Sequence, residues 1–199
     1  MFTGIVEGTA IVVGAYRREG NMRLSVRFRS NGRAYRTGES IAINGACLTA
    51  ASVRKDTVSF DVIAETLRKT NLGEITKGDV VNFERSMRSA DLIGGHLVAG
   101  HIDGTGKISE IENEGGSVRM TVRVQKNIGS MISEKGFVAV DGVSLTPADV
   151  SESRFSLYLI PETRRRTTFG VREVGDRVNI EIDIFAKYIK KFVDVRMNT

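Results

Sequence analysis

Four side chains in this 199-residue chain carry the groups that acid–base and nucleophilic chemistry uses most often. They are Ser40, Cys47, His96 and His101, and they include the only cysteine and both histidines of the chain. A thiol or hydroxyl can attack an electrophilic carbon, and an imidazole can accept a proton at neutral pH. A lone cysteine is also a common buried apolar residue, so both interpretations of Cys47 stay open.

The same residue types argue against several other kinds of site. A closed zinc site needs about four ligands, and one cysteine with two histidines is too few. The chain has neither a P-loop nor a glycine-rich turn between a strand and a helix, which are the usual phosphate-binding motifs. The sequence therefore predicts no metal ion and no cofactor.

The surroundings of these residues occur twice in the chain. Residues 45–84 align without a gap with residues 142–181, and residues 4–10 align with residues 100–106. The matched motifs are NGACLTA with DGVSLTP, AETLRKTNLG with PETRRRTTFG, KGDVVNFE with VGDRVNIE, and GIVEGTA with GHIDGTG. A repeat of this length is the size of a whole domain. It predicts a tandem duplication of one small fold.

The duplication keeps the glycines and the Leu-Thr and Glu-Thr pairs but changes the reactive side chains. The changed pairs are Cys47 with Ser144, Ile5 with His101, and Ser40 with Phe137. Two pockets of one shape should bind the same molecule, and different reactive groups would give the two bound copies different fates. This pattern is what a dismutation between two identical substrates requires.

Short stretches rich in Val, Ile and Thr, broken by Gly, Asn and Asp, predict a β protein. The expected strands cover 10–15, 22–28, 40–43, 48–53, 57–62 and 80–83 in the first half, and 118–124, 136–140, 144–150, 154–160 and 177–182 in the second. About six short strands per half favour a small closed antiparallel barrel. The predicted fold is therefore all-β, a tandem duplication of a six-stranded antiparallel barrel with a C-terminal α-helix.

Three segments depart from the β pattern. Residues 64–70 and 161–167 are expected to form single helical turns after a strand. Near the C-terminus, apolar residues recur at helical spacing; they are Phe185, Tyr188, Ile189, Phe192 and Val193. This helix has no counterpart in the first half. It predicts packing against other subunits, with docking on its own barrel as the alternative.

Composition narrows the class of protein. The apolar share is 41% and the charged share 27%, as in soluble globular proteins. No apolar run is long enough to span a membrane and no signal peptide is evident, which predicts a cytoplasmic protein. The net charge is +5 and Trp is absent. Because aromatics do not interleave with the basic residues, a solvated basic surface is favoured over a nucleic-acid interface.

At these motifs the chain resembles the α-chain type of riboflavin synthase, a family of two-barrel lumazine-binding proteins. The resemblance rests on MFTGIVEG, NGACLT, GGHLVAGHIDG, VDGVSLT, LIPETRRRTT and NIEID, in register from Met1 to about Asp183. It implies a first lumazine-binding barrel in 1–97, a second in 98–184 and a trimerisation helix in 185–199. It also implies a homotrimer, with lumazine synthase as a further partner. Neither nucleic acid nor a membrane is expected as a partner.

The reaction implied by the resemblance takes place between two molecules of 6,7-dimethyl-8-ribityllumazine. One molecule gives a four-carbon unit to the other, which yields riboflavin and 5-amino-6-(D-ribitylamino)uracil, the last step of riboflavin biosynthesis. The 7-methyl protons are acidic because the anion delocalises into the ring. We expect His101 to act as the base, and Cys47 and Ser40 to attack the other lumazine or to orient an attacking water.

The resemblance also implies two sets of substrate-binding residues. One set is Gly4, Ile5, Val6, Cys47, Leu48, Thr49, Asp61, Val62, Ile63, Ala64, Glu65 and Thr66. The other is Gly100, His101, Ile102, Lys135, Ser144, Leu145, Thr146, Tyr158, Leu159, Ile160, Pro161, Glu162 and Thr163. The productive site is expected between the first barrel of one subunit and the second barrel of another.

Some positions leave alternatives open. Ala46 fills a place beside the cysteine where the family often has another small or sulfur-bearing residue, and Tyr158 and Arg164–Arg166 are local choices at the pocket rim. Asp141 and Asp183 match family positions linked to activity, or they cap turns. The alternative function is a lumazine- or flavin-binding protein without turnover, as in related proteins of luminous bacteria.

Overall fold

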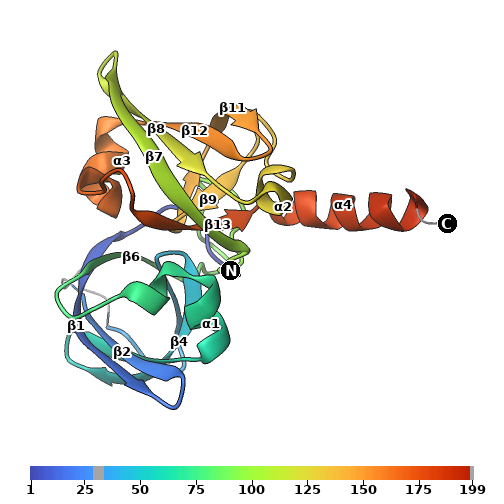
Figure 1. Cartoon of the computed structure of the whole chain (residues 1–199). Coiled ribbons are helices and arrows are strands. Elements are labelled where there is room, and N and C mark those ends of the chain that lie inside the picture. Colours follow the sequence, from blue (N-terminus) through green and yellow to red (C-terminus); the bar gives the residue numbers. More distant parts are fainter. Residues whose placement is uncertain (29–33, 198–199) are drawn as a thin grey trace.

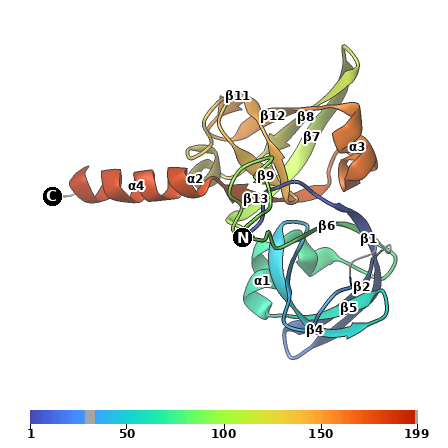
Figure 2. The ribbon, with the colours of Figure 1, turned by 180° about the vertical axis from the view of Figure 1, so that it is seen from behind.

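The computed structural model describes residues 1–28 and 34–197. They form two β bodies stacked on each other, and one long helix, α4 (Ile184–Met197), extends away from the second body (Figure 1). The two halves of the chain separate into these two bodies. The N-terminus lies at the junction between them, as the view from behind also shows (Figure 2).

The first body is a closed antiparallel barrel with the strand order β1-β2-β5-β4-β3-β6. The strands are β1 (Gly8–Arg18), β2 (Asn21–Arg27), β3 (Ser40–Ile43), β4 (Ala46–Arg54), β5 (Thr57–Val62) and β6 (Val80–Arg85). Every second residue of β2 (Met22, Leu24 and Val26) is buried in the barrel core. Pairing of β6 with β1 closes the barrel and leaves no free sheet edge.

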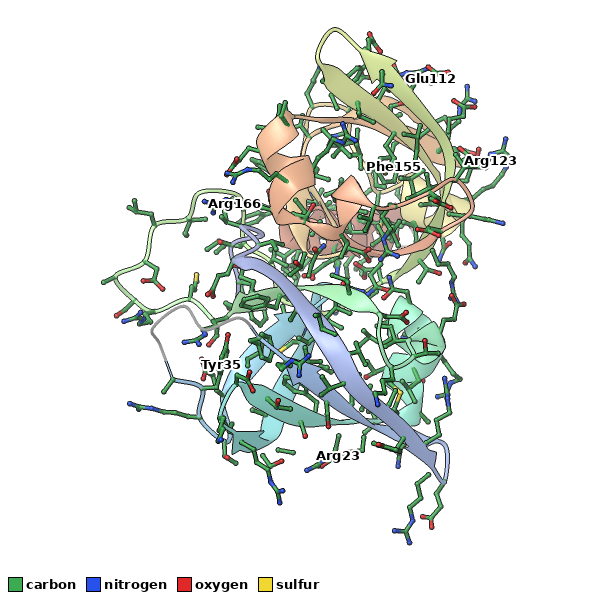
Figure 3. The ribbon with its side chains drawn as sticks, turned by 90° about the vertical axis from the view of Figure 1, so that its left-hand side faces the viewer. Arg23, Tyr35, Glu112, Arg123, Phe155 and Arg166 are labelled. Atoms are coloured by element: carbon green, nitrogen blue, oxygen red, sulfur yellow. The ribbon has the colours of Figure 1, made fainter. Side chains whose placement is uncertain are left out.

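The second body is a curled sheet with the order β10-β9-β13-β7-β8-β12-β11. The strands are β7 (Gly104–Glu114), β8 (Ser117–Arg123), β9 (Val138–Val140), β10 (Val143–Leu145), β11 (Pro147–Ser151), β12 (Arg154–Leu159) and β13 (Arg177–Ile182). Phe155 lies inside this body, whereas Arg23 lies on the outer side of the first barrel (Figure 3). The duplicated β fold is confirmed, but this half has seven strands instead of six.

Pro147 explains the extra strand. Its repeat mate, the residue aligned with it in the other half, is Ala50. Ala50 donates its N–H to the carbonyl of Glu39 at 2.9 Å. Proline has no N–H and cannot make this bond. The carbonyl side of the contact survives, because Lys135 N donates to Pro147 O as Gly38 N donates to Ala50 O. The single expected strand 144–150 therefore appears as β10 and β11.

Short helices follow the last hairpin of each body. They are α1 (Ala64–Lys69) with the 3-10 turn η1 (Asn71–Glu74), and α3 (Pro161–Arg166) with η2 (Thr168–Gly170); α2 (Lys126–Gly129) precedes β9. In each pair the threonine between the two turns caps the second one. The hydroxyl of Thr70 accepts from Leu72 N, and that of Thr167 accepts from Phe169 N. Both expected helical turns are confirmed.

A buried polar seam joins the two bodies. Asn82 accepts from Thr168 N and donates to Asp141 O, while Asn179 accepts from Asn71 N and donates to the carbonyl of Asn44. Each of these contacts has its equivalent with the two bodies interchanged, so the bodies are related by an approximate two-fold axis. Because all of these groups are buried, they fix the relative position of the bodies.

The seam leaves no room for side chains at its centre. Gly45 and Gly142 have φ near +80° and face each other. A Cβ on either glycine would lie within 2.8 Å of a backbone nitrogen of the other.

One charged pair breaks the symmetry of the seam. Asp141 occupies the place of Asn44 and is fully buried, with Arg172 Nη2 at 2.6 Å from its Oδ2. Ile75 is the repeat mate of Arg172. The second half thus replaces a neutral amide and an isoleucine by an ion pair.

Helix α4 makes little contact with the rest of the chain. Asp183 begins it, because its Oδ1 accepts from Phe185 N at 3.0 Å; this confirms a capping role for Asp183. Lys187 Nζ lies 2.6 Å from Asp103 Oδ2. No residue of 184–197 is buried, and residues 198–199 of the expected helical segment lie outside the described residues. Docking of this helix on its own barrel is therefore wrong for this chain.

Among residues 1–28 and 34–197, the structure contains no helix with the length and apolar character to cross a membrane.

Candidate functional site

The segments that lead into the two bodies, residues 2–6 and 98–102, are exchanged: each lies against the other body. Ser144 of the second body donates its N–H to Gly4 O at 2.8 Å, and Cys47 of the first barrel donates its N–H to Gly100 O at 2.9 Å. Phe2 pairs with Val98 where the two segments cross. Each half of the chain therefore completes the site of the other half.

This exchange corrects the expected grouping of the binding residues. Gly4–Val6 were expected beside Cys47, and Gly100–Ile102 beside Ser144. Instead, Val6 belongs to the core of the second body and Ile102 packs on the core of the first barrel. Sequence alignment reveals which segments are equivalent, but only tertiary contacts reveal which barrel each segment lies on.

Gly4 and Gly100 make the close approach of the exchanged segments possible. Their φ angles are +74° and +81°, a region that favours glycine. A Cβ on Gly100 would lie 2.5 Å from the Cβ of Cys47, and one on Gly4 would lie 2.6 Å from the Cβ of Ser144. Both glycines are therefore fixed by geometry and contact the turn that carries a reactive residue.

We define the first site as Ser40, Cys47–Thr49 and Asp61–Thr66 together with Gly100–Ile102. Ser40 pairs with Thr49, and Cys47 pairs with Ala42 on the same hairpin. His101 is exposed and lies between Gly100 and Ile102, which are both held against the first barrel. The exchange thus brings all three predicted catalytic residues, Ser40, Cys47 and His101, to one site.

Cys47 is half-buried and is packed partly against a small apolar cluster that contains Phe2 and Val98. The apolar and the reactive interpretations of this cysteine therefore both describe part of its surroundings. Ser40 is half-buried at the start of β3.

We define the second site as Lys135, Phe137, Ser144–Thr146 and Tyr158–Thr163 together with Gly4–Val6. Where the first site has His101, Ser40 and Asp61, this site has Ile5, Phe137 and Tyr158. The last three side chains are 43–49% exposed. The second site is therefore more apolar and offers an aromatic and aliphatic surface to a flat ring system.

Sequence reasoning did not assign a role to His96, which contacts the second site. Its Nδ1 lies 2.7 Å from Ser144 Oγ, and its ring stacks on Phe137 with the centroids 5.1 Å apart. Burial lowers the pKa of His96, and the nearby Asp183 opposes this shift. At neutral pH the imidazole is thus uncharged and can hydrogen-bond the Ser144 hydroxyl.

Several predicted binding residues make local contacts instead. Asp61 lies 2.6 Å from Arg23, beside a surface groove that also includes Val62 and Ile63. Glu65 pairs with Arg68 and Lys69 on α1, and Glu162 pairs with Arg165 and Arg166 on α3. The two glutamates therefore face the basic residues of their own helices.

The remaining predicted residues lie near these contacts. Leu48, Val62 and Leu159 are buried; Thr49, Ile63, Thr146, Ile160, Pro161 and Lys135 are exposed; Ala64, Thr66, Leu145 and Thr163 are half-buried. Among the described residues, no three His, Cys, Asp or Glu side chains gather as a metal site.

Comparison with known proteins decides the family. The model of the lumazine binding domain matches residues 3–86 and again residues 99–183. Riboflavin synthase of Escherichia coli is 44% identical over 186 residues, which is 92% of this chain and 87% of that protein. The chain belongs to the riboflavin synthase family.

Other riboflavin synthases are similarly close. The Bacillus subtilis protein is 37% identical, with 97% of this chain and 90% of that protein covered, and the Mycobacterium bovis protein is 40% identical, with 97% and 98% covered. These alignments cover nearly the whole of this chain, so they include both repeats.

Solved structures show the same fold at lower identity. LumP complexed with riboflavin has a TM-score of 0.85 at 24% identity, and LumP complexed with 6,7-dimethyl-8-(1'-D-ribityl) lumazine has a TM-score of 0.82 at 23% identity. Each alignment covers 92% of this chain and 99% of the LumP chain. This likeness concerns the two-barrel architecture.

Proposed function

We propose that this protein is a riboflavin synthase that converts two molecules of 6,7-dimethyl-8-ribityllumazine into riboflavin and 5-amino-6-(D-ribitylamino)uracil. The observation that carries the proposal is a lumazine-binding domain that occurs twice, with different reactive residues at two equivalent sites: Ser40, Cys47 and His101 at one, Ser144 and His96 at the other. In such a dismutation one substrate copy loses four carbons and the other gains them. Two sites of like shape and unlike chemistry suit that division.

The residues of the two sites support different roles. In the first site, we assign to His101 the role of accepting a proton from a 7-methyl group, or of passing it to water. Cys47 and Ser40 offer a nucleophile or orient a water toward C7 of the ring. The second site offers an apolar surface around Ser144, which suits holding the partner ring. Two rings held face to face gain most of their advantage from proximity.

The test of this function is an assay with purified protein and the dimethyl lumazine alone. Formation of riboflavin, followed by its absorbance, supports the proposal. Tight binding of the lumazine without any riboflavin would instead support a binding protein.

Replacement of Cys47 by Ser is expected to slow single-turnover riboflavin formation by about tenfold or more. A thiolate is a stronger nucleophile than an alcohol, whereas the turn geometry is preserved. Ser144→Ala is the matched control, because Ser144 occupies the same turn of the other body. Lumazine affinity is recorded separately for both variants. Equal losses of rate would contradict an unequal division of chemistry between these two residues.

The proposed assembly is a homotrimer in which the first site of one subunit faces the second site of another. Support comes from α4, whose apolar residues are exposed: Phe185, Tyr188, Ile189, Phe192 and Val193 are each at least 52% accessible to solvent. Such an apolar stripe is costly in water unless another surface covers it. Association with lumazine synthase stays a prediction carried by the family resemblance, and a cytoplasmic location stays a prediction carried by the sequence composition.

Truncation after Asp183 is expected to leave folded β bodies that no longer form trimers. The reason is that no residue of 184–197 is buried within the chain, so its removal costs the fold little. Sedimentation measures the change in mass, and circular dichroism checks the fold. A truncated protein that still sediments as an undiminished trimer would exclude α4 as the assembly element.

A further inference from the structure

Two buried carboxylates lie at equivalent points of the fold, near the ends of β6 and β13. Glu84 is 6% exposed and Glu181 is 3% exposed. The repeat aligns them, since they end the matched motifs KGDVVNFE and VGDRVNIE. Both lie directly behind an exchanged segment. The mechanism proposed above uses neither of them.

Glu181 binds the backbone of the segment that enters the first site. Ala99 N donates to its Oε1 at 2.7 Å, and Gly100 N donates to its Oε2 at 3.0 Å. The carbonyl of Gly100 in turn accepts from Cys47 N at 2.9 Å. Gly100 is therefore held from both sides, by Glu181 and by the turn that carries Cys47. His101 is the next residue in the chain.

We propose that Glu181 is a positioning residue of the first site: its carboxylate holds the amides of Ala99 and Gly100 and thereby fixes His101 against the Cys47 turn. This inference rests on the proposed function only for its kinetic consequence. The contact between Glu181 and the segment can be tested without any turnover.

The equivalent carboxylate of Glu84 is held more firmly. It accepts from Thr3 N at 2.7 Å, from Thr3 Oγ1 at 2.8 Å and from Gly4 N at 3.0 Å. Ala99 is the repeat mate of Thr3 and has no hydroxyl. Glu181 thus lacks one hydrogen bond that its counterpart has. Because hydrogen bonds to a carboxylate favour its charged form, Glu181 should be easier to protonate than Glu84.

The electrostatic surroundings agree with this difference. Burial raises the pKa of Glu181 to about 7, the amides of Ala99 and Gly100 and the charge of Lys187 oppose the rise, and Asp103 adds to it. Burial also raises the pKa of Glu84, against the three hydrogen bonds from Thr3 and Gly4 and with a contribution from Glu7. Glu181 therefore changes charge near neutral pH.

Protonation would weaken the hold on the segment. The ionised carboxylate accepts with both oxygens, whereas the acid form turns one oxygen into a donor that cannot accept from an amide in the same direction. The first site should therefore be ordered when pH is above the pKa of Glu181 and should loosen below it. Stability runs the other way: a raised pKa means that the folded protein binds the proton more tightly, so stability falls as pH rises from the usual range of Glu to about 7.

The direct test observes the Gly100 amide by nuclear magnetic resonance in full-length protein labelled with ¹⁵N-glycine. In the parent protein the chemical shift of this amide should change with pH, with a midpoint of about pH 7. Glu181→Gln should abolish this pH dependence, and Glu84→Gln should leave it unchanged. Ala99→Thr should shift the midpoint to lower pH by supplying the missing hydroxyl. A midpoint unchanged by Glu181→Gln or by Ala99→Thr would overturn the assignment.

The kinetic test follows riboflavin formation in single turnover across the same pH range. Below about pH 7 the parent rate should fall. Glu181→Gln should be slower by about 10- to 100-fold and should lack the part of this acid limb that Glu181 causes. Ala99→Thr should move the limb to lower pH, which would not happen if the limb came from a group other than Glu181. A parent protein that forms no riboflavin would refute the proposed function, while the Gly100 amide would still decide the role of Glu181. If Glu181→Gln fails to fold, Ala99→Thr alone carries both tests.

Discussion

Replacing His101 by Gln is expected to slow riboflavin formation by about 10²- to 10⁴-fold, the usual contribution of a general base. His101 is exposed and lies in the chain between Gly100, which bonds the Cys47 amide, and Ile102, which packs on the first barrel. Glutamine keeps the size and polarity of the side chain but accepts no proton at neutral pH. Single-turnover rates with lumazine affinity recorded in parallel measure the effect.

The matched control is Ile5→Ala, because Ile5 is the repeat mate of His101 and lies at the second site. It should lower lumazine affinity and change the rate of the bound complex far less. A loss well under tenfold for His101→Gln would mean that His101 only shapes the first site.

Replacing Asp141 by Asn is expected to destabilise the protein by about 3–5 kcal/mol, the usual cost of removing one partner from a buried ion pair. Asp141 is fully buried, and the Arg172 side chain is 19% exposed. Asp176 lies 3.6 Å from Arg172 and replaces only part of the lost contact. The backbone tolerates the change, since Asn44 has the same left-handed conformation. Denaturant unfolding measures the free energy.

Adding Arg172→Ile should recover most of that loss. The double variant recreates the Asn44 and Ile75 arrangement that the first half already uses at the seam. Its new amide would face Thr168, the repeat mate of Asn71. A double variant no more stable than Asp141→Asn alone would contradict the view that the ion pair replaces a neutral pair. Full stability of Asp141→Asn would contradict it as well.

The strands of this fold could be predicted well where the burial pattern is strong. The strands at 40–43, 57–62 and 177–182 have the bounds expected from the sequence. The longest strand of the second half, β7 (Gly104–Glu114), was not predicted. Its residues are mostly polar and only two of them are buried, so the apolar periodicity on which strand prediction depends is weak there.

The site was predictable in its residue types but not in its pairing. Family resemblance pointed to Cys47 and His101, and the structure places both beside Gly100. The exchange of segments was not predictable, because aligned motifs carry no information about which body a linker contacts. Glu181 could have been noticed from the repeat alone. A glutamate kept at the end of a buried strand in both halves is unusual unless a partner satisfies it.

The exchanged segments also constrain the order in which a growing chain can finish folding. Domains at the N-terminus generally fold first during synthesis, and the first barrel has all its strands once Arg85 is made. Its reactive site, however, lacks Gly100–Ile102 until the second half has begun. Thr3 to Val6, which are made before either body, must wait until Ser144 has been added before they reach their place. A chain broken off between the halves would therefore contain a finished barrel without a finished site.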